Sequence, residues 1–183
     1  MTAFEQKSLI EMVLYILNKT GGIDFYHVFK IIYFAEMKHL AKWGIRLQKD
    51  DLCALEYGPV PSKLYDAVKR KNAPGTQLSS MLFEVADFAG NDAPNVLLPK
   101  RQADMDYISK SEQEALDTSI AENASLTFSE LKEKSHDAAW KEAYEKPTGL
   151  RIISPVSMAK VAGLDENALE YINEQMELEK ALA

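Results

Sequence analysis

The segment from Asp24 to Trp43 constrains the fold more than any other part of the sequence. Asp24 is a good helix N-cap because its carboxylate can accept hydrogen bonds from free backbone N–H groups, and Gly44 can end the helix in the left-handed conformation. Apolar residues surround much of the helix circumference: Val28, Ile31, Ile32, Phe34, Ala35 and Leu40. A helix that is apolar on most sides lies in the core, so we expect other elements to pack around it.

Several other segments carry helix signals. An apolar stripe at helical spacing predicts a helix from Phe4 to Lys19, and the two glycines after it can end that helix. Ser109 and Thr127 each precede a glutamate by three residues, which is the capping-box pattern of a helix start. Pro61 suits the first position of a helix, where its missing N–H has no partner to lose. Further helical segments are expected over residues 140–144, 156–162 and 165–182.

The remaining segments indicate a small amount of sheet. Partial alternation of apolar side chains predicts a strand from Met81 to Phe88, and residues 95–98 can pair back on it as a hairpin. Leu150 to Ile153 is another strand candidate, and residues 47–57 fit a strand or a loop. Two turns outside regular structure are expected, over Gly58-Pro59-Val60-Pro61 and over residues 72–77. We expect an α-rich α+β fold: a single domain of about seven helices with a small antiparallel β-sheet or hairpin.

Charge is distributed unevenly along the chain. The 183 residues include 21 Lys or Arg and 28 Asp or Glu, a formal charge of −7, and an acidic chain is a poor general ligand for nucleic-acid phosphates. Between Tyr26 and Lys71 nine basic residues face five acidic ones, so this stretch carries +4 and the rest of the chain −11. The acidic excess gathers after Gly163, which makes the C-terminal segment a candidate surface for a basic partner.

Several functional classes find no support in the sequence. The single cysteine, Cys53, cannot form an intramolecular disulfide or a thiolate metal cluster. No apolar run approaches the roughly 20 residues of a membrane span, and the N-terminal segment lacks the basic leader of a signal peptide, so we expect a cytoplasmic protein. P-loop, G-x-G-x-x-G and H-E-x-x-H motifs are missing, so we expect no cofactor and no metal.

A few side chains are candidates for catalysis. Glu36 and His39 have the i, i+3 spacing of di-iron ligands, but such sites need a second pair and two more carboxylates, so we interpret them as a surface ion pair. His136 shares a helix face with Trp140, and we interpret it as an imidazole that packs on the indole and hydrogen-bonds a backbone carbonyl rather than as a base. Cys53 is interpreted as a small apolar side chain rather than as a nucleophile partnered by a histidine. We therefore predict no catalytic residue and no enzyme.

Three blocks of the sequence together resemble the Panacea domain of SocA-like antitoxins. They are the helix pattern Lys30-Ile31-Ile32-Tyr33-Phe34-Ala35, the run Tyr57-Gly58-Pro59-Val60-Pro61, and Ser135-His136 with a tryptophan a few residues later, in the order expected of the family. The resemblance covers residues 2–149, and we expect residues 150–183 to form a C-terminal helical extension packed on the same domain. The motif residues are Tyr33, Phe34, Trp43, Gly58, Pro59, Val60, Pro61, Tyr65, His136 and Trp140.

The resemblance implies a non-enzymatic antitoxin of a bacterial two-gene toxin–antitoxin system, which binds and neutralises a cognate protein toxin. One mode known in the family is delivery of the toxin to a Clp-type protease, with the antitoxin as proteolytic adaptor, and other relatives are known only as phage-associated proteins. We expect the motif to hold the fold, with Tyr33, Trp43, Tyr65 and Trp140 in the core. Toxin contacts are then expected elsewhere on the surface.

Two alternative functions stay open at this point. One is a phage- or mobile-element-associated DNA-binding regulator that uses the basic stretch, and the other is an enzyme that depends on His136 or on the Glu36–His39 pair. We do not expect nucleic-acid binding, because Lys69, Arg70 and Lys71 at the end of a helix also complement its dipole. The sequence leaves open the identity of the toxin, its binding face and the oligomeric state.

Overall fold

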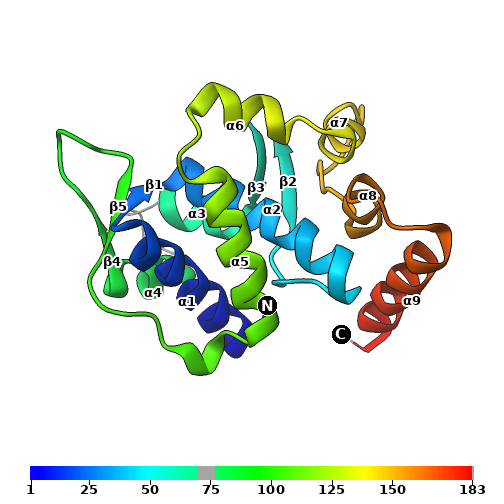
Figure 1. The fold of residues 1–183 in the computed structure, drawn as a ribbon, viewed down its shortest axis with the longest axis horizontal. Coiled ribbons are helices and arrows are strands. Elements are labelled where there is room, and N and C mark those ends of the chain that lie inside the picture. The colour runs from blue at the N-terminus through cyan, green and yellow to red at the C-terminus, as the bar shows by residue number, and fades with distance from the viewer. Residues whose placement is uncertain (70–76, 183) are drawn as a thin grey trace.

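Helix α2 (Phe25–Trp43) runs through the middle of the structure, a computed structural model that describes residues 1–69 and 77–182 (Figure 1). The Asp24 side chain caps this helix by accepting a hydrogen bond from the backbone N–H of His27, and Gly44 ends it at φ 67°. Residues 28–36 are buried without interruption, so this part of α2 has no face in water. The predicted central helix is confirmed.

The other helices pack around α2, and two of them, α5 and α6, begin at the predicted caps. Side chains of Ser109 and Thr127 close capping boxes with Glu112 and Glu130 at the starts of α5 and α6. Among the described residues there are nine α-helices, two more than expected. Besides α2 they are α1 (Ala3–Thr20), α3 (Ser62–Lys69), α4 (Gln77–Val85), α5 (Lys110–Asn123), α6 (Phe128–Ser135), α7 (Ala138–Tyr144), α8 (Pro155–Val161) and α9 (Glu166–Leu182).

Two small antiparallel sheets complete the α-rich α+β fold that the sequence predicts. The first has the strand order β1-β5-β4, formed by β1 (Ile23–Asp24), β5 (Val96–Pro99) and β4 (Ala86–Phe88), so the predicted hairpin exists. The second pairs β2 (Leu52–Leu55) with β3 (Gly58–Pro61). The expected strand at 150–153 is reduced to one isolated bridge, which pairs residue 152 with residue 53 on the other side of β2.

The strand predicted from Met81 to Phe88 is wrong for most of its length. Helix α4 covers its first five residues, and only β4 is extended. Buried Leu78, Leu82 and Val85 recur at helical spacing and face α1 and α3, so tertiary packing outweighs the partial alternation. The turn expected over residues 72–77 lies outside the described residues except at its last position, which starts α4.

The Gly-Pro-Val-Pro run is a strand, not the predicted irregular turn. Leu52 and Ala54 of β2 point their backbone hydrogen-bonding groups away from β3, toward the segment on the other side. Their register partners Pro61 and Pro59 must therefore face outward too, away from β2. At such positions a proline breaks no ladder bond, which is why two prolines fit in β3. The actual turn of this hairpin is formed by residues 56 and 57.

Helix α2 joins two hydrophobic clusters. The first lies between α1, α2, α3, α4 and α5, and the second lies between α2, α6, α7, α8 and α9. Helix α8 packs on α2 and α7, and α9 packs on α8, so the last helices gather at the end of the molecule opposite the β1-β5-β4 sheet (Figure 1). In the described part of the chain no helix is long and apolar enough to cross a membrane.

Candidate functional site

Lys30, the first residue of the helix motif, is fully buried in α2 and reaches the second motif block. Its Nζ donates a hydrogen bond to the backbone oxygen of Pro59 at 2.7 Å and lies 4.5 Å from the ring centre of Tyr26. The carbonyl of Pro59 faces outward from β3, and no further strand lies beside β3 in the described part of the chain. Lys30 therefore takes the place of a neighbouring strand. Burial lowers the pKa of Lys30 to about 7 because desolvation penalises the ammonium.

Gly58 brings the third motif block to the same point. Its φ is 97°, in the region that favours glycine. A Cβ atom there would lie 2.6 Å from Oγ of Ser135 and 3.0 Å from Nζ of Lys30. Only a residue without a side chain lets these three groups meet, so this glycine is required by both conformation and space.

His136 and Trp140 close the cluster on the α6–α7 side. Their rings stack with centres 3.7 Å apart and an interplanar angle of 5°, as the predicted packing requires. The indole Nε1 of Trp140 donates to the backbone oxygen of Leu55 at 2.9 Å, which fastens α7 to the end of β2. The three motif blocks, far apart in sequence, thus meet, and with Tyr26 they form one cluster that is buried at its centre and half-buried at its edge. We call it the motif cluster: Tyr26, Lys30, Gly58, Pro59, Ser135, His136 and Trp140.

The environment of His136 favours a neutral imidazole. Burial and the nearby charges of Lys132 and Lys30 lower its pKa, whereas Asp137 and a backbone hydrogen bond with Glu56 raise it less. Its Nε2 is buried and has no hydrogen-bond partner among the described residues. Such an atom cannot exchange protons with a substrate in solution, so the geometry does not favour a general base.

Asp137 does not orient His136 as a catalytic carboxylate would. One carboxylate oxygen accepts a hydrogen bond from the Tyr33 hydroxyl at 2.8 Å, and the other accepts one from the backbone N–H of Trp140 at 2.9 Å. Asp137 thereby caps α7 and ties it to α2. Its role is architectural.

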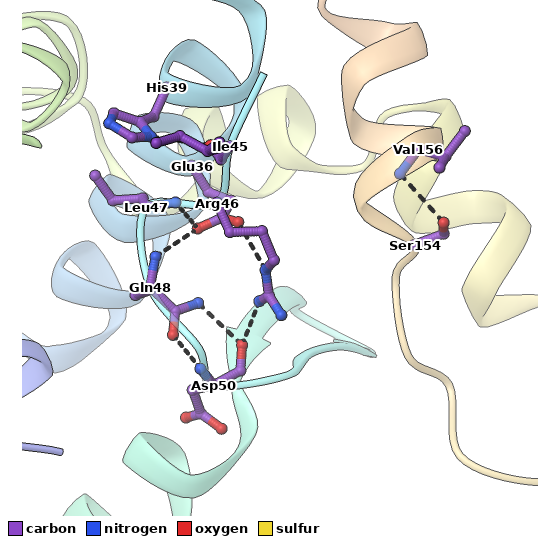
Figure 2. A network of polar contacts seen from close by, with 9 residues as sticks. All are labelled: Glu36, His39, Ile45, Arg46, Leu47, Gln48, Asp50, Ser154 and Val156. Carbon is purple, nitrogen blue, oxygen red and sulfur yellow. Dashed lines mark hydrogen bonds and ion pairs between the residues drawn. The ribbon is translucent and has the colours of Figure 1, made fainter. Parts of the chain in front are cut away.

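The interpretation of Glu36 and His39 as a surface ion pair is wrong, because both side chains are buried. Figure 2 shows Glu36 at the centre of a network with the loop that follows α2. Its carboxylate pairs with Nε of Arg46 at 3.0 Å and accepts the backbone N–H groups of Leu47 and Gln48. The guanidinium of Arg46 continues to the backbone oxygen of Asp50 at 2.7 Å. Because no face of α2 is exposed to solvent here, the carboxylate of Glu36 needs partners inside the protein.

His39 lies on α2 and contacts the same loop, but it does not share a ligand position with Glu36. Its Nδ1 lies 2.9 Å from the backbone oxygen of Ile45, and its Nε2 lies 3.2 Å from Oγ of Ser111 (Figure 2 shows the first two residues). Both ring nitrogens are thus engaged by structural partners. Within the described ranges, 1–69 and 77–182, no group of three His, Cys, Asp or Glu side chains could hold a metal ion.

Cys53 lies in β2 and is half-buried. Burial raises the pKa of its thiol, with the nearby carboxylates of Asp51 and Asp50 adding to the effect. A raised pKa disfavours the nucleophilic thiolate, so the geometry agrees with a small apolar side chain.

The motif aromatics do not all lie in the core as expected. Tyr33 is fully buried, whereas Tyr65 and Trp140 are half-buried. Trp43 is 48% exposed at the end of α2, so its expected core position is wrong. The helix ends one residue later at Gly44, and Nζ of Lys42 lies 5.3 Å from the centre of the Trp43 ring.

An open cavity of about 560 Å³ lies beside the motif cluster, at the N-terminal end of α2. Its lining is mainly aromatic, and we call it the aromatic groove. Tyr57 and Phe128 are 52% and 47% exposed there, and the rings of Tyr26 and Phe128 lie 4.3 Å apart. The main lining residues are Phe25, Tyr26, Phe29, Tyr57, Tyr65 and Phe128.

Three lysines place their ammonium groups over rings that line the aromatic groove. Lys30 lies 4.5 Å from the ring centre of Tyr26, Lys69 lies 4.6 Å from that of Phe25, and Lys132 lies 5.3 Å from that of Tyr57. The groove therefore joins an apolar surface to positive charge.

Sequence reasoning missed the buried lysine and the aromatic groove. A signal for Lys30 was present, because a helix that is apolar around its circumference leaves no exposed face for a charged residue. Tyr26 and Phe128 are 102 positions apart and carry no local signal that they meet.

Comparison with known families matches residues 28–141 to the family described as antitoxin SocA-like, Panacea domain. The match covers more than half of the chain and includes all three motif blocks, which confirms the resemblance seen in the sequence. No curated protein and no solved structure matches the chain. The protein belongs to the SocA-like antitoxin family and carries its Panacea domain.

Proposed function

We propose that this protein is an antitoxin that neutralises a cognate protein toxin by direct binding. The observation that carries the proposal is the family match over residues 28–141. The geometry supports it, because the motif residues engage one another in the motif cluster and leave exposed aromatic side chains for a partner. We further propose that residues 2–149 form the family domain, that residues 150–183 form an extension packed on it, and that the protein acts in the cytoplasm.

The test is co-expression with the growth-inhibiting gene that we expect next to this one. The antitoxin should restore growth, and a tagged copy should retain the toxin as a stoichiometric complex through size-exclusion chromatography. If no neighbouring product inhibits growth, or if growth is restored without any complex, direct neutralisation is wrong.

Delivery of the toxin to a Clp-type protease is a second mode of the same binding event. The two modes separate in cells that lack the protease. Direct inhibition restores growth there as well, whereas an adaptor restores growth only where the protease is present and shortens the half-life of the toxin.

The structure lends less support to the two other classes. Three basic residues of the +4 stretch, Lys38, Lys42 and Arg46, each pair with a carboxylate, which reduces the charge available to nucleic-acid phosphates. Arg70 and Lys71 lie outside the described residues. An enzyme based on His136 or on Glu36 and His39 would need side chains that are here committed to packing and backbone contacts.

A further inference from the structure

We propose that the aromatic groove is the toxin-binding surface and that it takes a toxin segment with an apolar side chain flanked by carboxylates. This inference rests on the proposed antitoxin function and adds to it the binding face and the chemistry of the partner.

Two exposed aromatic rings in the lining favour an apolar side chain of the partner. Tyr57 and Phe128 are each about half exposed, side by side at a ring-centre distance of 5.9 Å. Exposed aromatic rings beside a cavity are typical of the few residues that dominate binding energy at protein interfaces. A cavity of about 560 Å³ accommodates one or two large side chains of a partner.

Two lysines beside the groove favour carboxylates in the partner segment. Lys69 and Lys132 each lie over a ring, and within the described residues neither ammonium has a carboxylate at ion-pair distance. An incoming carboxylate can therefore pair with them without breaking an existing ion pair, and a basic segment would be repelled.

The acidic residue in the lining does not offset this charge. Asp24 is held by His27, whose ring forms an ion pair with it, and by the backbone N–H of the same residue. Burial alone would raise the pKa of Asp24, but these contacts with His27 lower it. The carboxylate thus has its partners already, and the two outer lysines define the charge that a ligand meets.

The groove is also held in shape before any partner binds. The hydroxyl of Tyr26 donates to the backbone oxygen of Tyr57 at 2.7 Å, and Nε2 of His27 lies 2.7 Å from the backbone oxygen of Leu126. These bonds fix α2, the β2–β3 turn and the start of α6 relative to one another. Less conformational entropy is then lost on binding.

The experiment measures the dissociation constant of the purified neighbouring toxin by calorimetry. Tyr57→Ala and Phe128→Ala should each weaken binding at least tenfold. The double variant Lys69→Gln/Lys132→Gln should weaken it about tenfold at low salt and flatten its salt dependence. Circular dichroism and the melting temperature verify that each variant is folded. Because Tyr57 lies in a turn, we expect Tyr57→Ala to disturb the fold least.

Matched controls lie away from the aromatic groove. Trp43→Ala removes an aromatic ring of nearly equal exposure, 48%, at the other end of α2. Lys110→Gln/Lys160→Gln removes two exposed charges. Both controls should bind within twofold of the wild type.

Three results would overturn the inference. If folded groove variants bind the toxin within twofold of the wild type, the groove is the wrong face while the antitoxin function stands. If hydrogen exchange shows that the toxin segment protected by the wild type is basic or lacks an apolar side chain, the proposed chemistry is wrong. Absence of any binding by the wild type would reject the proposed function itself, and the inference with it.

Discussion

Lys30 and Glu36 lie six residues apart on α2, and both are fully buried, yet their charged groups have different kinds of partner. Glu36 has a counter-charge in Arg46 and two backbone N–H donors. Lys30 has a backbone oxygen of β3 and the face of an aromatic ring. The pKa of Lys30 consequently falls to about 7.

This difference in partners distinguishes a buried charge that has a counter-charge from one that has none among the described residues. Around Glu36 the charge is matched, and its partners fix the loop that leads from α2 to β2 (Figure 2). Around Lys30 the charge is unmatched, and what the fold needs from the side chain is a hydrogen-bond donor. Loss of the matched charge should therefore be costly at any pH near neutrality, whereas the energetic effect of Lys30 should depend on its protonation.

The largest effect is expected for Glu36→Ala. The variant leaves Arg46 beside two unsatisfied backbone N–H groups in a buried site, so we expect a loss of about 3–5 kcal/mol in the free energy of unfolding, measured by urea denaturation. The control is Glu114→Ala, which removes a carboxylate that is 54% exposed and paired with Lys42. It should cost less than about 1 kcal/mol. Equal losses in the two variants would contradict the distinction between matched buried and exposed charges.

Gly58→Ala should follow, with a loss of about 3 kcal/mol. The new methyl group would lie 2.6 Å from Oγ of Ser135, closer than a Cβ can pack, and 3.0 Å from Nζ of Lys30, and the backbone is held at φ 97°. Gly163→Ala is the matched control, because Gly163 has φ 88° and no atom within 4 Å of an added Cβ. It should cost about 1 kcal/mol, from backbone strain alone. Urea denaturation of both variants measures the packing contribution as their difference, which should vanish if the motif cluster is loosely packed.

His136→Ala should destabilise the protein by about 1–3 kcal/mol, because it removes the ring stacked on Trp140. The measurement pairs the melting temperature with growth rescue by the folded variant. We expect a lower melting temperature and unchanged toxin neutralisation. An unchanged melting temperature with lost neutralisation would instead favour a direct functional role for the imidazole.

The smallest effect per unit change is a pH dependence of stability that Lys30 should confer. Its pKa is about 7 in the folded protein and near the ordinary value of 10.5 in the unfolded chain. Between these values the unfolded chain binds more protons, so stability should rise with pH and the penalty should be fully present below pH 7. Relative to Lys30→Met, the wild type should gain about 1 kcal/mol per pH unit between pH 7.5 and 9.5. A flat difference over this range would show that Lys30 keeps an ordinary pKa.

Short sequence signals predict those helix ends that depend on interactions between residues close in sequence. The capping boxes at Ser109 and Thr127 and the glycine after Trp43 mark helix ends within a residue, because the interactions that stop or start a helix span three or four positions. Residues 81–85 were mispredicted because their short apolar pattern fits both a strand and a helix. Packing against α3, the preceding helix, and against α1, which lies about 60 residues earlier, decides between the two.

The candidate site was predicted only in part for the same reason. Family-like blocks identified Gly58, His136 and Trp140 as residues that hold the fold, and their contacts agree with that role. Lys30 can join the blocks only because the outer edge of β3 packs against α2. No local sequence pattern encodes this packing. The aromatic groove likewise combines rings from α2, the β2–β3 turn and α6.

The two outward-facing prolines of β3 also affect the behaviour of the chain when it is partly unfolded. When α2 detaches during synthesis or unfolding, the outer edge of β3 becomes exposed, and an ordinary strand edge would then template intermolecular sheet growth. Pro59 and Pro61 offer no N–H groups along that edge, so it cannot form a regular ladder with another chain. The same residues that let Lys30 replace a strand thus protect the transiently open protein from aggregation.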